Sequence, residues 1–154
     1  MYIFRWIISL VLLSILSYFR ETLFLGVNEI IDGNFKYNPY SYQPKYLIEQ
    51  SKEDLLKLKF ILTALFSLLF ACFTIWALKI SFKTQLPYKL SLLVYTLIFI
   101  VAIIIILFSA ATNTFNNVYP FLRGIIDYIH NPLLFIVLST TILANDALNK
   151  KHFK

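Results

Sequence analysis

Long apolar runs alternate with short charged segments along the whole chain. The runs cover about residues 3–24, 60–79, 90–111 and 121–145. At about 1.5 Å per residue in a helix, runs of about 20 residues match a hydrocarbon core of about 30 Å. The pattern predicts an all-α integral membrane four-helix bundle, formed by a single transmembrane domain over residues 1–154.

The first run has an arginine near each end, Arg5 and Arg20. It resembles the core of a secretory signal, but no small-x-small cleavage site follows it. We therefore expect an uncleaved anchor helix, which could continue past Arg20 to residue 31.

Residues 32–50 form the one long polar segment, and we expect an extracytoplasmic loop there. Pro39 and Pro44 block a helix by removing N–H donors and fixing φ. Tyrosines suit the headgroup layer, where a ring can be half apolar and half hydrated. The four loop tyrosines, which are candidate contact residues, are Tyr37, Tyr40, Tyr42 and Tyr46.

Two helix boundaries are marked by local sequence. Ser51, three residues before Asp54, resembles a capping box that opens the second span. Asn131-Pro132 interrupts the last run, either as an N-cap followed by a first-turn proline or as a kink in one long helix. We expect the fourth helix to be kinked or broken near Pro132.

Composition excludes a soluble domain, because hydrophobic residues make up 59% and charged residues only 14% of the chain. The single cysteine, Cys72, and two distant histidines, His130 and His152, give no disulfide and no ordinary metal site. We expect no metal and no cofactor. Motifs of serine hydrolases, zinc proteases and P-loop enzymes are also missing.

The net charge of +6 points to lipid rather than nucleic acid once its distribution is considered. With four spans, the 14 basic residues divide seven and seven between the two sides. On the side of the termini they lie in short segments beside span ends, where the positive-inside rule counts most. We expect a bacterial inner membrane protein with both termini in the cytoplasm.

Four polar side chains of the last run recur at steps of four, four and three residues, which places them on one helix face. They are Tyr119, Arg123, Asp127 and His130. Ionisable groups cost about 2.5–3.5 kcal/mol each at the membrane centre on insertion scales. They could form a polar site between helices. Alternatively, they could form an interfacial turn in which Arg123 pairs with Asp127 and His130 meets headgroups.

A second polar cluster follows the first span and contains Arg20, Glu21, Asn28 and Glu29. Glu21 and Asn28 are seven residues apart and share a helix face, and Glu21 could pair with Arg123. Cys72, with His130 and Arg123, provides the residue types of a thiol transpeptidase. However, its mid-span depth separates it from the other two, and a buried cysteine is usually a small apolar filler.

The layout resembles the exosortase F system-associated family, small hydrophobic proteins of Bacteroidetes. The resemblance rests on Tyr18-Phe19-Arg20-Glu21-Thr22-Leu23-Phe24, on Leu55–Phe60, on Tyr119-Pro120-Phe121-Leu122-Arg123 and on Asn131-Pro132-Leu133-Leu134. An aromatic-Asp-Pro motif of that family is replaced here by Leu25-Gly26-Val27-Asn28. The resemblance implies a non-catalytic accessory of envelope protein sorting and carries over no active-site residue.

The sequence therefore favours a non-enzymatic accessory subunit of a membrane complex. Its expected partners are the lipid bilayer and another membrane protein, and not nucleic acid. Two alternatives are a minimal intramembrane thiol hydrolase or transpeptidase, and a small channel or transporter subunit.

Overall fold

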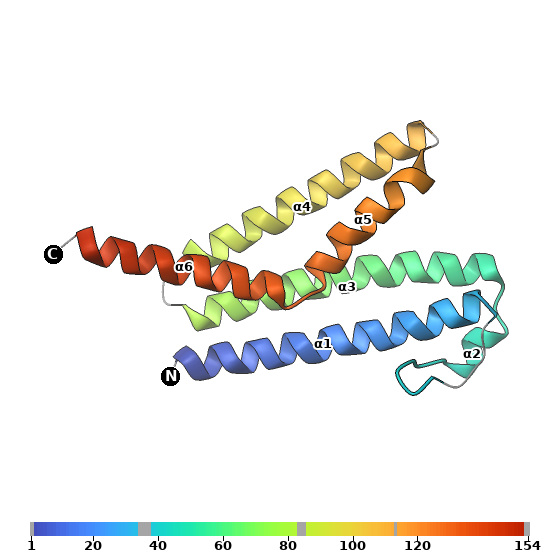
Figure 1. Cartoon of the computed structure of the whole chain (residues 1–154), viewed down its shortest axis with the longest axis horizontal. Helices are drawn as coiled ribbons and strands as arrows, with labels where there is room; N and C mark the ends of the chain where they lie inside the picture. Colours follow the sequence, from blue (N-terminus) through green and yellow to red (C-terminus); the bar gives the residue numbers. More distant parts are fainter. Residues whose placement is uncertain (1, 34–37, 83–85, 113, 153–154) are drawn as a thin grey trace.

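Helices make up nearly all of the computed structural model, which describes residues 2–33, 38–82, 86–112 and 114–152 (Figure 1). The helices are α1 (Tyr2–Ile31), α2 (Lys45–Ile48), α3 (Lys52–Ser81), α4 (Leu86–Ala111), α5 (Phe115–Ile129) and α6 (Leu133–His152). Three of them, α1, α3 and α4, are long and apolar enough to cross a membrane. The predicted all-α membrane bundle is confirmed, and the first helix does continue to Ile31.

The fourth apolar run is a broken span. Its two parts, Pro120–Ile129 in α5 and Leu133–Ala144 in α6, are bent by 60° at the break. Figure 1 shows α5 starting at the end of the molecule near α2 and α6 finishing at the end near the two termini. Together the two helices therefore traverse the molecule once, rather than entering and leaving on one side.

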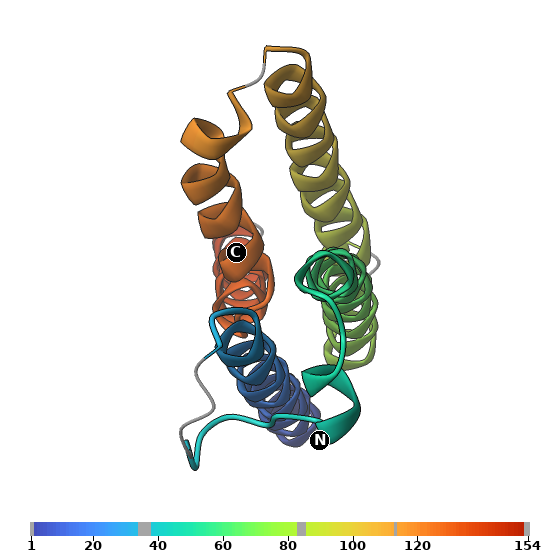
Figure 2. The ribbon, with the colours of Figure 1, turned by 90° about the vertical axis from the view of Figure 1, so that its right-hand side faces the viewer.

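The helices form an elongated arrangement with α3 and α6 in the middle. α1 lies on one side of them, and α4 and α5 lie on the other side (Figures 1 and 2). α1 and α3 run side by side in opposite directions, and the end of α3 and the start of α4 lie at the same end of the molecule as the start of α1 and the end of α6. This grouping agrees with the topology expected for four crossings.

Local sequence explains where two helices begin. Ser51 caps α3 by accepting a hydrogen bond from the Asp54 amide at 3.2 Å. At the break, the Asn131 side chain accepts a hydrogen bond from the Leu133 amide at 2.9 Å. Since Pro132 has no N–H to donate, α5 stops before it and Asn131 caps the new helix.

The interior is lined by small hydroxyl residues between large apolar ones. Among the described residues, the buried polar side chains are serine or threonine, apart from His130. Small residues let helix backbones approach closely inside a membrane, where packing rather than water exclusion drives association. The buried apolar core includes Leu13, Phe24, Phe66, Phe70, Leu78, Tyr95, Ile129, Phe135, Leu138 and Ile142. Many large apolar side chains point outward, as lipid-facing surfaces require.

The segment before α3 folds back against α1 and is held there by several contacts. Glu29 on α1 accepts hydrogen bonds from the side chains of Asn38, Ser41 and Gln43. The Tyr42 amide donates to the Thr22 carbonyl at 3.1 Å. We call this group of contacts the loop clamp.

Two further features support the loop clamp. A small second core beneath it joins Leu47 of α2 to Val27, Ile30 and Leu55. Gly26 lies where the loop crosses α1, and a Cβ atom there would come within 1.8 Å of the Tyr42 carbonyl oxygen. The backbone can approach this closely only because residue 26 has no side chain.

We predict that Gly26→Ala detaches the loop and lowers the free energy of unfolding by about 1–3 kcal/mol, because the new methyl group overlaps backbone. Thermal unfolding in detergent, followed by tryptophan fluorescence, measures this change. Trypsin cleavage after exposed Lys45 should also become faster.

The matched control is Gly124→Ala on α5, where a Cβ meets nothing within 4 Å. It should raise stability by up to about 1 kcal/mol through helix propensity. Wild-type stability and cleavage in Gly26→Ala would contradict the loop clamp.

Candidate functional site

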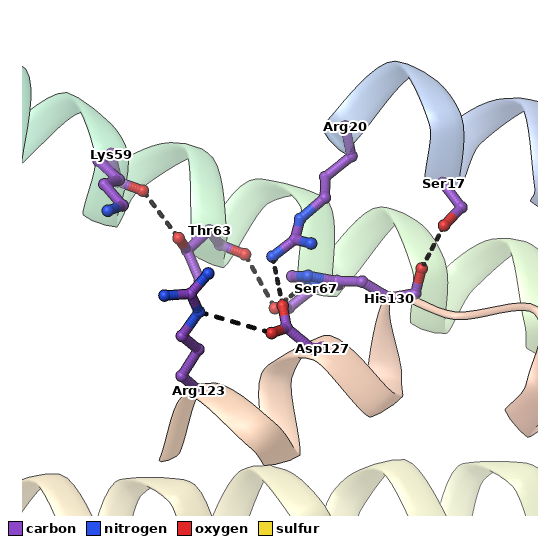
Figure 3. A network of polar contacts seen from close by, with 8 residues as sticks. All are labelled: Ser17, Arg20, Lys59, Thr63, Ser67, Arg123, Asp127 and His130. Atoms are coloured by element: carbon purple, nitrogen blue, oxygen red, sulfur yellow. Dashed lines mark hydrogen bonds and ion pairs between the residues drawn. The ribbon is translucent and has the colours of Figure 1, made fainter. Parts of the chain in front are cut away.

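His130 lies at the break between α5 and α6 and joins it to both α1 and α3 (Figure 3). Only 1% of its surface is exposed. Its Nε2 lies 2.8 Å from the Ser67 hydroxyl, and its ring centroid lies 5.3 Å from that of Phe70. Its backbone carbonyl accepts a hydrogen bond from the Ser17 hydroxyl at 3.0 Å. The break is therefore fixed by one contact to each neighbouring helix.

The hydrogen-bond network favours one tautomer of His130. The Ser67 hydroxyl has a single proton, which it donates to the Thr63 carbonyl at 2.8 Å. Ser67 can then only accept from the ring, so Nε2 carries the hydrogen and Nδ1 is a bare acceptor. Nδ1 is buried and has no partner among the described residues.

Asp127 links two arginines one turn before the break. Its Oδ1 lies 2.9 Å from Arg20 Nη2, and its Oδ2 lies 3.6 Å from Arg123 Nε. The Arg20 guanidinium also lies 4.7 Å from the centroid of the Phe24 ring, a cation–π contact. The Arg20 side chain is only 18% exposed, whereas that of Arg123 is 64% exposed. Arg20–Asp127 is therefore the main ion pair and ties α1 to α5.

The depth of this pair follows from the register of α1 and α3. Arg5 donates to the Ile80 carbonyl at 3.4 Å, so these two residues lie at one level near the termini. Counting at about 1.5 Å per residue, Arg20 lies about 22 Å from that level and Lys59 about 32 Å. With the Arg5 level taken as the near surface of a hydrocarbon core of about 30 Å, the Arg20–Asp127 pair lies inside the core and Lys59 lies at its far surface.

A polar row on α3 faces the cluster. Thr63 donates to the Lys59 carbonyl at 2.8 Å, and Ser67 continues the row toward His130 (Figure 3). The spacing of four residues puts Lys59, Thr63 and Ser67 on one helix face. Sequence reasoning missed this row, although its period was visible.

The structure brings Arg123, Asp127 and His130 together, as their spacing predicts. His130 is buried between helices, so the alternative in which it meets headgroups is wrong, whereas Arg123 does pair with Asp127, as that alternative had it. The other possibility, a pairing of Arg123 with Glu21, is not found among the described residues. Glu21 is exposed and makes no ion pair among the described residues, whereas the neighbouring Arg20 reaches Asp127.

Two other residues of the predicted clusters remain to be placed. Asn28 is partly buried on α1, eight residues after Arg20 toward the end of that helix. The side chain of Tyr119 lies outside what the structure describes.

Cys72 does not join the polar cluster. It is five residues beyond Ser67, which rotates it by about 140° around α3. Its side chain is exposed, whereas the adjacent Ala71 and the cluster-facing Phe70 are buried. This geometry gives no support to a site that combines Cys72 with His130.

The interface between α3 and α4 is closed by side chains. Tyr95 donates to the Thr74 hydroxyl at 3.0 Å, and both residues are buried. The interface therefore offers no support for a water path between these two helices.

The tyrosines of the loop point outward although the loop itself is clamped. Tyr40, Tyr42 and Tyr46 are 68%, 57% and 70% exposed. Glu29, which holds the loop, lies about 36 Å along α1 from the Arg5 level, beyond a hydrocarbon core of about 30 Å. Tyr37, the fourth candidate, lies outside the described residues. We call the three exposed rings the tyrosine surface.

Comparison of the chain with protein-family models, with curated proteins and with solved structures gives no match in any of the three. Among the described residues, no group of three or more His, Cys, Asp or Glu could hold a metal ion. The fold itself defines a helical membrane protein with three long apolar helices and one broken pair.

We predict that Asp127→Asn lowers the free energy of unfolding by about 1–3 kcal/mol, because it leaves Arg20 without a carboxylate in the membrane. Arg20→Gln should have a similar effect. The double variant should lose less than the sum of the two, with a coupling of about 1–2 kcal/mol. SDS titration of the folded protein in mixed micelles measures each value.

Arg123→Gln, the matched control, should cost less than about 1 kcal/mol, since its contact is longer and more exposed. Strict additivity of Arg20→Gln and Asp127→Asn would argue against the pair.

We also predict that Ser67→Ala destabilises the fold by about 1–2 kcal/mol, because buried His130 loses the one side-chain hydrogen-bond partner that it has among the described residues. Ser14→Ala is the control, since the Ser14 hydroxyl is exposed and bonds only to its own helix. That change should stay within about 0.5 kcal/mol of wild type in the same titration. Equal effects of the two substitutions would show that His130 does not depend on Ser67.

Proposed function

We propose that this chain is a non-enzymatic accessory subunit of a membrane complex that takes part in protein sorting at the cell envelope. It would lie in the bacterial inner membrane with both termini in the cytoplasm and the loop outside. The observation that carries the proposal is the tyrosine surface, three exposed aromatic side chains on a loop that is clamped to α1.

The loop clamp prepares the tyrosine surface for contact with another protein. A loop that is already ordered loses little conformational entropy when it binds. Tyrosine adds a large contact area with only two side-chain torsions to fix, and it can donate a hydrogen bond from its hydroxyl. Glu29, which holds the loop, lies about 36 Å along α1 from the Arg5 level, so we expect the tyrosine surface at the headgroups and a partner with a part that reaches them.

The polar groups inside the bundle support a structural role. Asp127 contacts both Arg20 and Arg123, and His130 contacts Ser67. A nucleophilic enzyme needs a nucleophile within reach of a base. Cys72, the single thiol in the chain, points away from His130. These contacts hold α1, α3 and α5 in position.

The role in sorting draws on the resemblance to the exosortase F system-associated family. The residues that carry this resemblance include Arg20 and Arg123, which both contact Asp127. The cytoplasmic placement of the termini draws on the basic residues near the span ends on that side, such as Lys79 and Lys89.

Replacing Tyr40, Tyr42 and Tyr46 together by alanine tests the proposal. We expect the wild-type chain to co-purify from native membranes with one membrane protein in fixed stoichiometry. The triple variant should lose at least about tenfold in affinity for that protein, as expected when central aromatic contacts are removed. Its thermal unfolding should be unchanged, because the three rings are exposed.

Tyr18→Ala is the matched control, since Tyr18 is equally exposed but lies within the apolar part of α1. It should retain the partner. If the triple variant retained the partner as well as wild type, or if both variants lost it equally, the tyrosine surface would not be the contact. A chain that always purified alone would contradict the subunit role itself.

A further inference from the structure

Three cationic side chains from three helices lie on the Asp127 side of the polar network, away from His130. They are Arg20 on α1, Lys59 on α3 and Arg123 on α5 (Figure 3). Lys59 is partly buried on the α3 face that carries the polar row. Positive charges converge in this way at a cost, unless a negative group is bound between them.

The carboxylates nearby leave part of this charge unmatched. Asp127 makes one contact with each arginine, through different oxygens. Asp32, the residue after α1, makes no ion pair with Lys59 within the described residues. Each guanidinium carries five N–H donors and the ammonium carries three, so the donors greatly exceed the acceptors. Arg20 Nε is buried and has no partner among the described residues.

The depths of Arg20 and Lys59 place the cationic group between the outer part of the hydrocarbon core and its far surface. Arg20 lies about 8 Å below the far surface of the hydrocarbon core and Lys59 lies at it, if that surface is taken about 30 Å from the Arg5 level. Phe60, next to Lys59, and Phe121, on α5 before Arg123, are 56% and 63% exposed. The cationic group is thus bordered by apolar surface that acyl chains can cover.

We propose that Arg20, Lys59 and Arg123 bind the phosphate of an anionic lipid headgroup where α5 meets α1 and α3. Arginine can donate two parallel hydrogen bonds to two phosphate oxygens, and lysine adds a positive charge on a flexible side chain. Basic sites between transmembrane helices are a known mode of anionic lipid recognition. Asp127 contacts one nitrogen of each guanidinium, and the largely exposed Arg123 keeps both of its Nη groups for the phosphate. Free inorganic phosphate has the same headgroup chemistry, but the exposed rings beside the site favour the lipid.

The purified full-length chain in neutral detergent provides the test. Thermal unfolding is measured during titration with short-chain phosphatidylglycerol, with phosphatidylcholine of the same chain length, or with inorganic phosphate. We expect phosphatidylglycerol to raise the unfolding temperature at a concentration at least about tenfold lower than the concentration at which phosphatidylcholine or inorganic phosphate has the same effect. Native mass spectrometry should also detect phosphatidylglycerol retained from the membrane.

Lys59→Gln and Arg123→Gln remove cations that are partly or largely exposed, so both variants should fold. Each should weaken the response to phosphatidylglycerol by about tenfold, because each removes a charge-assisted contact. Lys57→Gln is the matched control, two residues from Lys59 on the same helix, where the lysine is exposed and contacts Asp54. It should respond as wild type does.

Three results would overturn the lipid site. One is an equal response to phosphatidylglycerol and phosphatidylcholine. Another is an undiminished response in the double variant Lys59→Gln/Arg123→Gln. The third is stabilisation by inorganic phosphate at the same concentration as the lipid, which would identify a soluble anion as the ligand. None of these measurements depends on the tyrosine surface, so this proposal and the subunit role can fail separately.

Discussion

A break in a membrane helix frees backbone groups that the surrounding hydrocarbon cannot satisfy, and this constraint shapes the whole bundle. The freed carbonyl of His130 accepts a hydrogen bond from Ser17 on α1, and the freed amide of Leu133 donates to Asn131. The side chain of His130 reaches Ser67 on α3. Because the partners come from two other helices, the break fixes the register of α1 and α3 as well as its own shape.

The two ends of the α1–α3 pair are fixed by different means. At the end near the termini, Arg5 donates to the carbonyl of Ile80 in the last turn of α3, where a cation also suits the helix dipole. At the other end, Glu29 gathers the polar loop against α1 and a small apolar core forms beneath it. Between these ends, Arg20 connects α1 to the broken span through Asp127. Polar contacts therefore join α1 to its neighbours at both of its ends and near Arg20. The apolar side chains that pack between these contacts set the distance between the helices.

The sequence predicted the helices and the break well, because apolar length and Pro132 act locally. It also predicted that Arg123, Asp127 and His130 share one helix face, since their spacing along a helix determines the direction in which each side chain leaves the axis. It could not select Arg20 over Glu21 as the partner of that face. Adjacent residues on a helix point about 100° apart, and a helix that is apolar on all sides carries little signal for its rotation.

The loop clamp on Glu29 was beyond sequence reasoning for a different reason. Its donors, Asn38, Ser41 and Gln43, follow no helical or strand period. Their convergence depends on the path of an irregular backbone across Gly26.

The sparse packing of α4 has a consequence for biogenesis. Of the three long apolar helices it has the smallest share of buried residues, so its stability in lipid owes little to its neighbours. Such a helix can partition into the bilayer by itself as soon as it leaves the translocation machinery. The broken span that follows α4 differs from it, because Asp127 contacts Arg20 on α1 and the break contacts Ser17 on α1 and Ser67 on α3. The last span to be synthesised therefore finds its polar partners on helices that were made before it.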